Sequence, residues 1–352
     1  MMLRLLKELV RPLRVRVYRN RFERRHRQRC YRDNAQAALK LIERYGLENP
    51  TGLYDEYIKD LKQYQFSFVE WHFLYRLSGK PAEYKEQFIS SLEAQRYYRK
   101  YIEDSVRQLF IDKSVFLNKF SHYIRRTVAD CRSGITKEVF QDKFYCKDII
   151  VKPVFGSLGI GVFKTSYNEI EQKGIDAFMA KAKEYGYVME ECITGCEELQ
   201  RFHPASLNTV RVITCVDGDE IRVFSSFVRF GVGNSIVDNV HTGGIYCSID
   251  VNDGIIDSSG FDQYGKEYDE HPDTHLIFAG TRIPHWHDIE TSCIESHRLV
   301  KTPIIGWDVC INARDEVEFI EGNHGPDLDL LQTPHKRGLA SEFIRIISSQ
   351  QA

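Results

Sequence analysis

Hydrophobic positions recur at helical spacing through the first third of the chain. Across residues 34–110 apolar side chains return every three or four positions, and breakers interrupt the pattern at Gly46, Gly52 and Gly79–Pro81. A repeat of about 3.6 residues puts such positions on one face of a helix, and glycine and proline end helices. The pattern therefore predicts a helical N-terminal unit of about four helices over residues 31–110.

Shorter segments replace this pattern after Asp112. A short strand is predicted over Lys113–Phe116 and a buried strand over Ile149–Pro153, and from Asp148 onward β-branched runs alternate with turns. An Asp217-Gly218 turn joins two strands into a hairpin. Strands are predicted over 187–191, 208–216, 220–230 and 245–249, and helices over 168–185, 290–299 and 336–348.

A second hairpin is predicted over Ile304–Asn323, where a polar turn separates two apolar strands. Side chains two apart on a strand share a face, so Glu321 and Asn323 point the same way, and an antiparallel partner brings Asp308 to the same spot. Three converging oxygen donors suit a hard cation such as Mg²⁺ that keeps coordination positions for nucleotide phosphates. The alternative is a plain hairpin with acidic residues on its solvent-exposed face.

A strand that ends in Lys152 is followed by a glycine-rich turn into another strand. The lysine supplies a point charge, and Gly156, Ser157, Gly159 and Gly161 let backbone N–H groups approach phosphate oxygens without obstruction by side chains. The turn leads into a strand and not a helix, so it is neither a Walker A loop nor a dinucleotide-binding loop. It predicts a glycine-covered hairpin over a nucleotide.

Composition places the chain among ordinary globular proteins. It has 352 residues, 42% hydrophobic and 28% charged. A net charge of −2 disfavours a general nucleic-acid binder, because phosphate-backbone binding needs clustered positive charge. Nine scattered cysteines indicate reduced thiols and not a disulfide framework. No apolar run reaches the ~18 residues that span a bilayer, and no signal-peptide pattern is present, so a cytoplasmic location is expected.

Positive charge is concentrated at the N-terminus. Residues 1–30 hold ten arginines and one lysine against Glu8 and Glu23. Leu3–Val10 fits a short basic amphipathic helix that is interrupted near Pro12, a type of segment that binds anionic membrane surfaces. This interpretation makes the protein peripheral at the inner face of the membrane. The alternative is a solvated basic arm that packs on its own protein or on a partner.

Two other kinds of site are weaker candidates. Histidines crowd residues 271–297, where His285 and His287 share a predicted strand face as candidate zinc ligands, but no matching Cys or Glu pattern accompanies them. Cys192-x-x-x-Cys196 is either a redox-active pair or a pair of small buried thiols.

The order of these motifs resembles the ATP-grasp superfamily: the Lys152 strand, the glycine loop, Glu190-Glu191 at a strand end, then Asp308 and Glu321-x-Asn323. The spacing from Asp308 to Asn323 is similar to the metal-binding end of D-alanine–D-alanine ligase and its relatives. More narrowly, three segments resemble the sugar-transfer associated ATP-grasp family, found with capsule and surface-polysaccharide synthesis. These segments are His203–Thr214, His241–Gly244 and Gly306–Asp308.

The resemblance covers residues 110–335 and implies an α+β fold of the ATP-grasp type, in which two α+β subdomains clasp ATP. It implies subdomains over 111–192 and 193–352, after the basic arm over 1–30 and the helical unit over 31–110. Many ATP-grasp ligases carry an α/β substrate-binding domain before the nucleotide domains. Here the helical unit stands in its place, so the resemblance says less about the acceptor substrate than about the nucleotide.

Site residues carry over from the resemblance position by position. Lys152 and Lys113 would contact ATP phosphates, Arg211 the γ-phosphate or an acyl-phosphate, and Glu198 the ribose. Glu190, Glu191 and Ile193 would form the hinge whose backbone meets adenine. Asp308, Glu321 and Asn323 would hold one or two Mg²⁺ ions that bridge phosphates.

Acceptor residues are less specific. The loop His241, Thr242, Gly243 and Gly244 lies near the acceptor substrate or is a tight turn before the strand that follows. Asn208 and His324 are the other candidate substrate-binding residues, although turn chemistry accounts equally well for the segment after His324.

These features predict an ATP- and Mg²⁺-dependent carboxylate–amine ligase that acts through an acyl-phosphate. By resemblance, it would attach an amino acid or another amine to a sugar acid for a surface polysaccharide. The first alternative is a kinase that phosphorylates a small acceptor. The second is a non-catalytic, ATP-gated partner of a glycosyltransferase, with the basic arm and the helical unit as docking surfaces.

Overall fold

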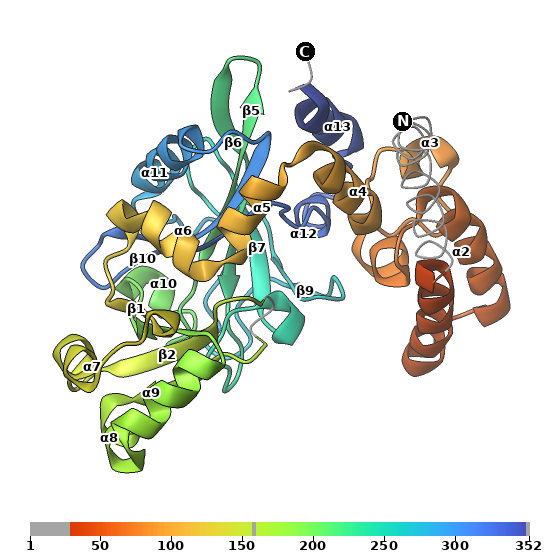
Figure 1. Ribbon diagram of the computed structural model, residues 1–352. Coiled ribbons are helices and arrows are strands. Elements are labelled where there is room, and N and C mark those ends of the chain that lie inside the picture. Colours follow the sequence, from red (N-terminus) through yellow and green to blue (C-terminus); the bar gives the residue numbers. More distant parts are fainter. Residues whose placement is uncertain (1–28, 157–159, 350–352) are drawn as a thin grey trace, which may run out of the picture.

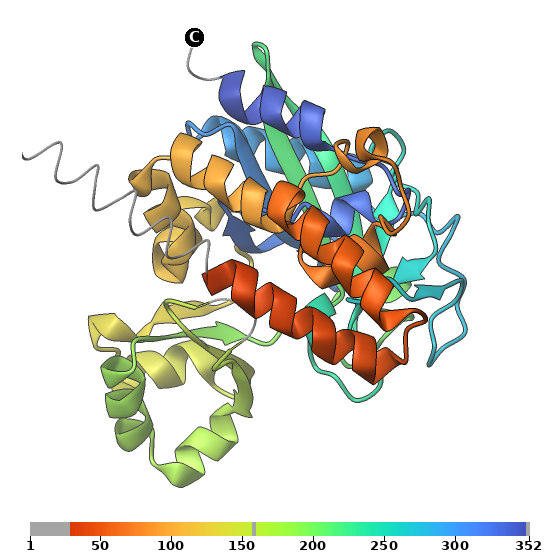
Figure 2. The same cartoon turned by 90° about the vertical axis from the view of Figure 1, so that its right-hand side faces the viewer.

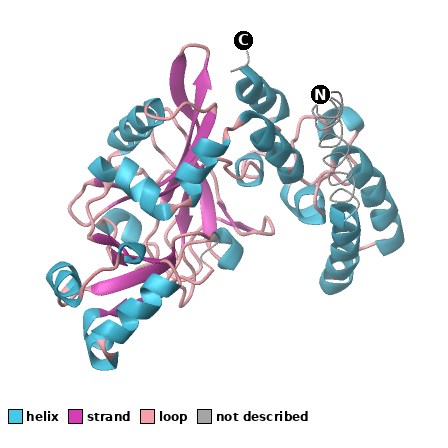
Figure 3. Cartoon of the chain, viewed as in Figure 1, coloured by secondary structure: helices cyan, strands magenta, loops and turns pink. Residues whose placement is uncertain are grey.

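Two β-sheets with helices packed on them follow a helical unit in the computed structural model, which describes residues 29–156 and 160–349 (Figure 1). Strands lie at the centre of the molecule and helices surround them (Figure 3). The helical unit sits to one side of the larger sheet and faces the viewer in Figure 2. The α+β class predicted from the sequence is confirmed.

The helical unit has a core of its own. It contains a helix over residues 29–45, α2 (Pro50–Tyr64), the π-helix η1 (Val69–Leu74) and α3 (Ala82–Lys85). Aromatic side chains fill the core, as Tyr57, Trp71 and Tyr75 are fully buried. Asp60 accepts hydrogen bonds from Trp71 Nε1 at 2.7 Å and from Lys85 Nζ at 2.5 Å. The tyrosines and phenylalanines of this unit therefore serve packing.

The next three helices pack on the larger sheet: α4 (Ser91–Tyr101), α5 (Asp104–Ile111) and α6 (Lys113–Lys119). The predicted strand over Lys113–Phe116 is wrong, because these residues begin α6. Asp112 caps this helix, and its Oδ1 accepts hydrogen bonds from the N–H groups of Ser114 at 3.0 Å and Val115 at 3.2 Å.

The smaller sheet has the strand order β1-β4-β2-β3, and all neighbouring strands are antiparallel. Its strands are β1 (Val128–Asp130), β2 (Asp148–Pro153), β3 (Phe163–Ser166) and β4 (Tyr187–Glu191). Helices α7 (Lys137–Phe144), α8 (Tyr167–Lys173) and α9 (Ile175–Glu184) share its core. The single helix predicted over 168–185 is thus two helices, since Gly174 breaks it with φ 95°.

The larger sheet has the order β11-β10-β5-β6-β7-β8-β9. Its strands are β5 (Val210–Asp217), β6 (Glu220–Phe230), β7 (Ile245–Ile249), β8 (Gly260–Phe261), β9 (Glu267–Tyr268), β10 (Ile304–Ile311) and β11 (Val317–Asn323). Helix α11 (Trp286–Arg298) packs on it, as do α12 (Asp329–Gln332) and α13 (Ala340–Ser348). Both predicted hairpins are confirmed, β5–β6 and β10–β11.

The expectations about membrane contact, cysteines and the basic arm are tested only in part. No helix in the described part of the chain is long and apolar enough to cross a membrane. The cysteines from Cys131 to Cys310 are free thiols. The predicted basic arm lies, apart from its last two residues, outside the residues that the structure describes.

Candidate active site

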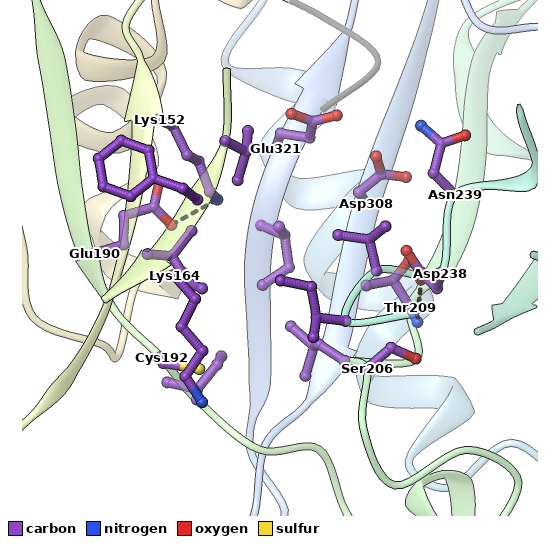
Figure 4. A pocket seen from close by; sticks show the side chains of 18 of the residues that line it. Lys152, Lys164, Glu190, Cys192, Ser206, Thr209, Asp238, Asn239, Asp308 and Glu321 are labelled. Carbon is purple, nitrogen blue, oxygen red and sulfur yellow. Dashed lines mark hydrogen bonds and ion pairs between the residues drawn. The ribbon is translucent and has the colours of Figure 1, made fainter. Parts of the chain in front are cut away.

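A cleft of about 520 Å³ lies between the two sheets. One wall comes from the smaller sheet, with Lys152, Lys164 and Glu190, and the other from the larger sheet, with Asp308 and Glu321 (Figure 4). Of the residues predicted from the sequence, the cleft is lined by Lys113, Lys152, Gly156, Glu190, Glu191, Ile193, Thr242, Asp308 and Glu321. Most of the predicted nucleotide and metal residues therefore meet in one place.

Lys152 is held by a buried carboxylate. Its Nζ lies 2.9 Å from Oε2 of Glu190, and Nε of Arg126 donates to the same oxygen at 2.7 Å. Burial opposes the charged form of Glu190, but Arg126 and Lys152 outweigh it and lower the pKa of Glu190 to about 2. Arg126 also bonds Glu318 at 3.0 Å. The network holds Nζ of Lys152 in place at the edge of the cleft.

Lys113 reaches the cleft from the N-terminal end of α6. Its Nζ donates to the carbonyl oxygen of Gly156 at 2.7 Å, so it stands where the glycine loop begins. Burial and the charge of Lys152 lower the pKa of Lys113, although Glu321 opposes the shift. Two ammonium groups thus lie near each other at one end of the cleft, which favours an anionic ligand there.

The glycine loop is described in part. Gly161 has φ 76°, and a Cβ there would lie 3.0 Å from Cγ of Pro153, so this turn needs glycine. Gly161 itself is not among the cleft residues. Ser157 and Gly159, two of the predicted phosphate contacts, lie outside the described residues.

Asp308 and Glu321 oppose each other across the β10–β11 ladder. Asp308 is 1% exposed and accepts hydrogen bonds from Nε and Nη2 of Arg211, the latter at 2.8 Å; its Oδ1 also forms an ion pair with Nη2 of Arg229 at 3.1 Å. Burial opposes ionisation of Asp308, yet the two guanidinium groups lower its pKa. Burial and then the charge of Asp308 raise the pKa of Glu321. The pair therefore favours one shared proton or a cation.

The donor set fits a divalent cation that arrives with further oxygen ligands. In the described chain, no three His, Cys, Asp or Glu side chains form a metal cluster by themselves. Asn323 stands two residues after Glu321, opposite Gly306, but is not among the cleft residues, so its role as a third ligand stays a prediction. A carboxylate has about four acceptor positions, so Asp308 keeps capacity beside its three arginine contacts. Mg²⁺ bound partly by phosphate suits such an incomplete set.

Arg211 lies behind Asp308. It is 5% exposed, stands opposite Asp308 in the β5–β10 ladder and is not among the cleft residues. Gly306 lies beside it: a Cβ there would be in ordinary contact with Cδ of Arg211 at 3.5 Å, but only 3.0 Å from Cβ of Pro326. Its predicted contact with phosphate stays a prediction. The contact that the structure describes is with Asp308.

Sequence reasoning missed Arg229, Asp238 and Asn239, which line the cleft. Nη2 of Arg229 contacts Asp308 and also donates to Oγ1 of Thr209 at 2.6 Å. Asp238 is buried and accepts from N of Thr209 at 2.9 Å. Burial raises the pKa of Asp238, against the charge of Arg229. An arginine between apolar neighbours was the available signal: Arg229 lies between Val228 and Phe230 on β6, as Arg211 lies between Val210 and Val212 on β5.

The predicted acceptor loop divides between two cavities. In the 3-10 helix η4 (Val240–Thr242), Thr242 lines the cleft and His241 lines a second cavity. Gly243 has φ 103°, and a Cβ on Gly244 would lie 2.4 Å from the carbonyl oxygen of Asp238. Both glycines are therefore required by the turn itself.

Three other predicted residues lie elsewhere. Glu198 is exposed on α10 (Glu197–Gln200) and outside the cleft lining, which includes Gln200. Asn208 is buried, and its Nδ2 donates to the carbonyl oxygens of Leu199 at 2.9 Å and His203 at 3.1 Å, so it organises a loop. His324 is partly buried and also outside the lining. Their binding roles stay predictions.

The zinc hypothesis is wrong for the described residues, since none of the histidines joins a metal cluster there. His287 is on helix α11 and His285 precedes it, so they share no strand. His297 is fully buried, with Nδ1 2.7 Å from Oγ1 of Thr214 and Nε2 2.9 Å from the carbonyl oxygen of Thr302. Burial lowers its pKa to about 4. Burial also raises the pKa of both Cys192 and Cys196, which disfavours reactive thiolates.

Two sheets that enclose a cleft with lysines on one wall and paired carboxylates on the other place the protein in the ATP-grasp class. The chain belongs to the sugar-transfer associated ATP-grasp family, which it matches over residues 92–347. The family and fold predicted from the sequence are thereby confirmed. No curated protein matches the chain.

Solved structures of ligases and synthetases show distant similarity. The ATP-grasp ligase PsnB, complexed with a phosphomimetic variant of its minimal precursor, Mg and ADP, is 13% identical with a TM-score of 0.44; the match covers 74% of this chain and 67% of that one. N5-carboxyaminoimidazole ribonucleotide synthetase from Thermotoga maritima is 12% identical with a TM-score of 0.41, over 74% of this chain and 56% of that one. N5-carboxyaminoimidazole synthetase from Staphylococcus aureus, complexed with ADP, is 11% identical with a TM-score of 0.42, over 69% and 53%.

Proposed function

We propose that the protein is an ATP- and Mg²⁺-dependent carboxylate–amine ligase. The observation that carries this proposal is one cleft with Lys113 and Lys152 on one side and the Asp308–Glu321 pair on the other. Glu321 interacts electrostatically with both lysines and with Asp308. Ammonium groups and a metal-binding carboxylate pair on facing walls suit the triphosphate of a nucleotide, whose charge needs both kinds of partner.

The side chains of the cleft would position the reactants. Lys152, held by Glu190, and Lys113 would bind phosphate oxygens, and the segment 191–194 would lie along the base. Mg²⁺ held by Asp308, Glu321 and Asn323 would neutralise charge on the transferred phosphoryl group. The acceptor carboxylate takes the γ-phosphoryl group and becomes an acyl-phosphate, ADP leaves, and the amine then displaces phosphate to form an amide. This sequence needs positioning and electrostatic stabilisation rather than a covalent nucleophile.

The finer assignment concerns the biological setting. The family is named for its association with sugar transfer, and a sugar acid as the carboxylate follows from that association. We infer that the product enters a surface polysaccharide and that the enzyme works in the cytoplasm. The basic N-terminal arm would give it a contact with anionic lipid or with a glycosyltransferase.

An ADP-release screen tests the proposal. Purified protein is incubated with ATP, MgCl₂, a panel of uronic acids and a panel of amines, and products are identified by mass. A ligase yields ADP and an amide, and added hydroxylamine traps a hydroxamate in place of the amide. A stable phosphorylated acceptor that resists hydroxylamine would instead establish the kinase. Tight nucleotide binding without turnover of any pair would favour the non-catalytic partner.

A further inference from the structure

A second cavity, of about 470 Å³, lies where the helical unit meets the larger sheet. Helices form its walls: the helix over residues 29–45 and η1 belong to the helical unit, and α4, η4 and α12 pack with the larger sheet. Figure 2 looks onto the helical unit that closes this side of the molecule. The cavity forms where the helical unit packs against the elements of the larger sheet. It is therefore a feature that the helical unit adds to the ATP-grasp fold.

Two carboxylates line the cavity. Glu70 and Asp329 line it, and among its described lining residues there is no lysine or arginine. Glu70 is 4% exposed, and its carboxylate accepts backbone N–H groups of Ser67 and Ser91, each at 2.6 Å. Oδ1 of Asp329 is buried and has no hydrogen-bond partner among the described residues. A buried carboxylate oxygen without a donor is costly unless a ligand supplies one.

Neighbouring carboxylates affect the pKa of Asp329. Burial, then the charges of Asp327 and Glu70, raise the pKa of Asp329 to about 8. At neutral pH it therefore holds a proton that a bound cation would replace. An ammonium group carries three donors and a positive charge, and so satisfies both needs of this site.

The rest of the wall combines amide groups with apolar side chains, among them Val69, Leu74, Leu92 and Leu330. The amide side chains of Asn34, Gln65, Gln95 and Gln263 line the cavity. Such groups suit hydroxyl groups of a ligand. A carboxylate on the ligand would lie near two carboxylates, without a lysine or arginine among the described lining residues to bind it. The cavity therefore favours amines that carry no acid group over α-amino acids.

A single turn of helix separates this cavity from the nucleotide cleft. Asn239 and Thr242 line the cleft, whereas His241 between them lines the cavity. A 3-10 helix has about three residues per turn, so neighbouring side chains of η4 point to different sides. The two sites share this turn as a wall.

We propose that this cavity binds the amine substrate, and that this substrate is a hydroxylated primary amine without a carboxylate, of the size of an amino alcohol or an amino sugar. The proposal rests on the proposed ligase function for the use made of the amine. Its binding chemistry rests on Asp329, Glu70 and the surrounding amides alone.

Calorimetric titration of the full chain tests the site directly. Ethanolamine, glucosamine and glycine are titrated separately, each with and without MgCl₂ and the non-hydrolysable nucleotide AMP-PNP. We expect ethanolamine or glucosamine to bind at least about tenfold more tightly than glycine, because only glycine brings a carboxylate into the acidic cavity.

Two variants locate the binding. Asp329→Asn removes the carboxylate that would ionise against a bound ammonium group, at nearly constant volume, and Gln95→Lys, at an exposed position of α4, places a fixed ammonium in the cavity wall; each is expected to weaken amine binding about tenfold or more. Asp219→Asn, in the exposed turn of the β5–β6 hairpin, is the matched control and should bind like the unmodified chain. Thermal unfolding of each variant confirms that it is folded.

Three results would overturn the proposal: no amine of the panel binds in either nucleotide state, glycine binds as tightly as the amines, or both cavity variants keep full affinity. Lys152→Met separates this question from the ligase proposal. It should abolish ADP release and leave amine binding unchanged, so the amine site is tested independently of the ligase activity.

Discussion

The nucleotide cleft and the second cavity treat buried charge in opposite ways. In the cleft, acidic groups are matched by basic ones: Glu190 contacts Arg126 and Lys152, and Asp308 contacts Arg211 and Arg229. In the cavity, Asp329 and Glu70 face each other without such a partner among the described lining residues. A matched network holds its side chains in place for a ligand of mixed charge. An unmatched pair leaves the countercharge to the ligand.

The largest expected effect comes from removing the charges that face each other across the cleft. Lys152→Met or Glu321→Gln should lower ADP release at least about 100-fold, because each removes a group aimed at developing phosphoryl charge. Steady-state ADP release with the substrates found in the screen measures this. Lys181→Met, on the exposed face of α9, is the control. Unchanged ADP release in Glu321→Gln would show that the metal assignment is wrong.

Breaking the matched network should destabilise the fold. Arg126→Met leaves Glu190 and Glu318 buried without their shared guanidinium, at a cost of about 3–5 kcal/mol. Arg345→Met removes a salt bridge to Asp217 whose arginine is 56% exposed, and should cost much less, because solvent screens the pair. Urea unfolding of both variants measures the difference. Equal losses would mean that burial does not distinguish the two ion pairs.

Asp329, near Glu70, should make the free energy of unfolding depend on pH. Asp329 keeps its proton up to a pKa of about 8 in the folded chain, against 3.8 for an ordinary aspartate. Between these two pH values the folded state binds more protons than the unfolded state. The stabilisation that the proton on Asp329 provides is therefore complete below pH 3.8 and is lost as pH rises through 8.

Asp329→Asn should remove that dependence. The free energy of unfolding of the variant, relative to the unmodified chain, should rise by about 1–3 kcal/mol between pH 5 and pH 8. The groups that face Asp329 are Asp327, Glu70, Tyr75, Tyr98 and Tyr246. Urea unfolding at pH 5, 6.5 and 8 tests this, and a constant difference across the three would contradict it.

The smallest effect is expected at the mouth of the cleft. Lys164 lines the cleft, but its side chain is 44% exposed and pairs with Asp148 at 2.8 Å. Lys164→Met should raise the KM for ATP about two- to fivefold with little change in kcat, because solvent screens this charge before and after binding. A loss as large as that of Lys152→Met would place Lys164 among the phosphate-binding groups.

Local patterns were enough to predict the β10–β11 hairpin. Alternation along the chain put Glu321 and Asn323 on one face, and the ladder does place Asp308 opposite Glu321. Where two local signals competed, the prediction failed. At Lys113 a short segment containing Val115 and Phe116 was predicted as a strand, yet the capping carboxylate of Asp112 begins a helix there.

Contacts between distant segments carried no local signal. Arg229 and Asp238 meet the site only through the pairing of β5 with β6 and the return of the loop before η4. The cavity of Glu70 and Asp329 joins residues more than 250 positions apart, where the helical unit meets α12. Its existence depends on how two units pack, which periodicity along one chain does not encode.

Arg126 has a mechanical consequence beyond its charge. One guanidinium joins Glu190 on the smaller sheet to Glu318 and the carbonyl oxygen of Phe319 on the larger sheet. The two walls of the cleft are therefore tied together at a buried point by one side chain. The spacing between β4 and β11 depends on Arg126, so its loss would change the width of the cleft as well as the charge of its wall.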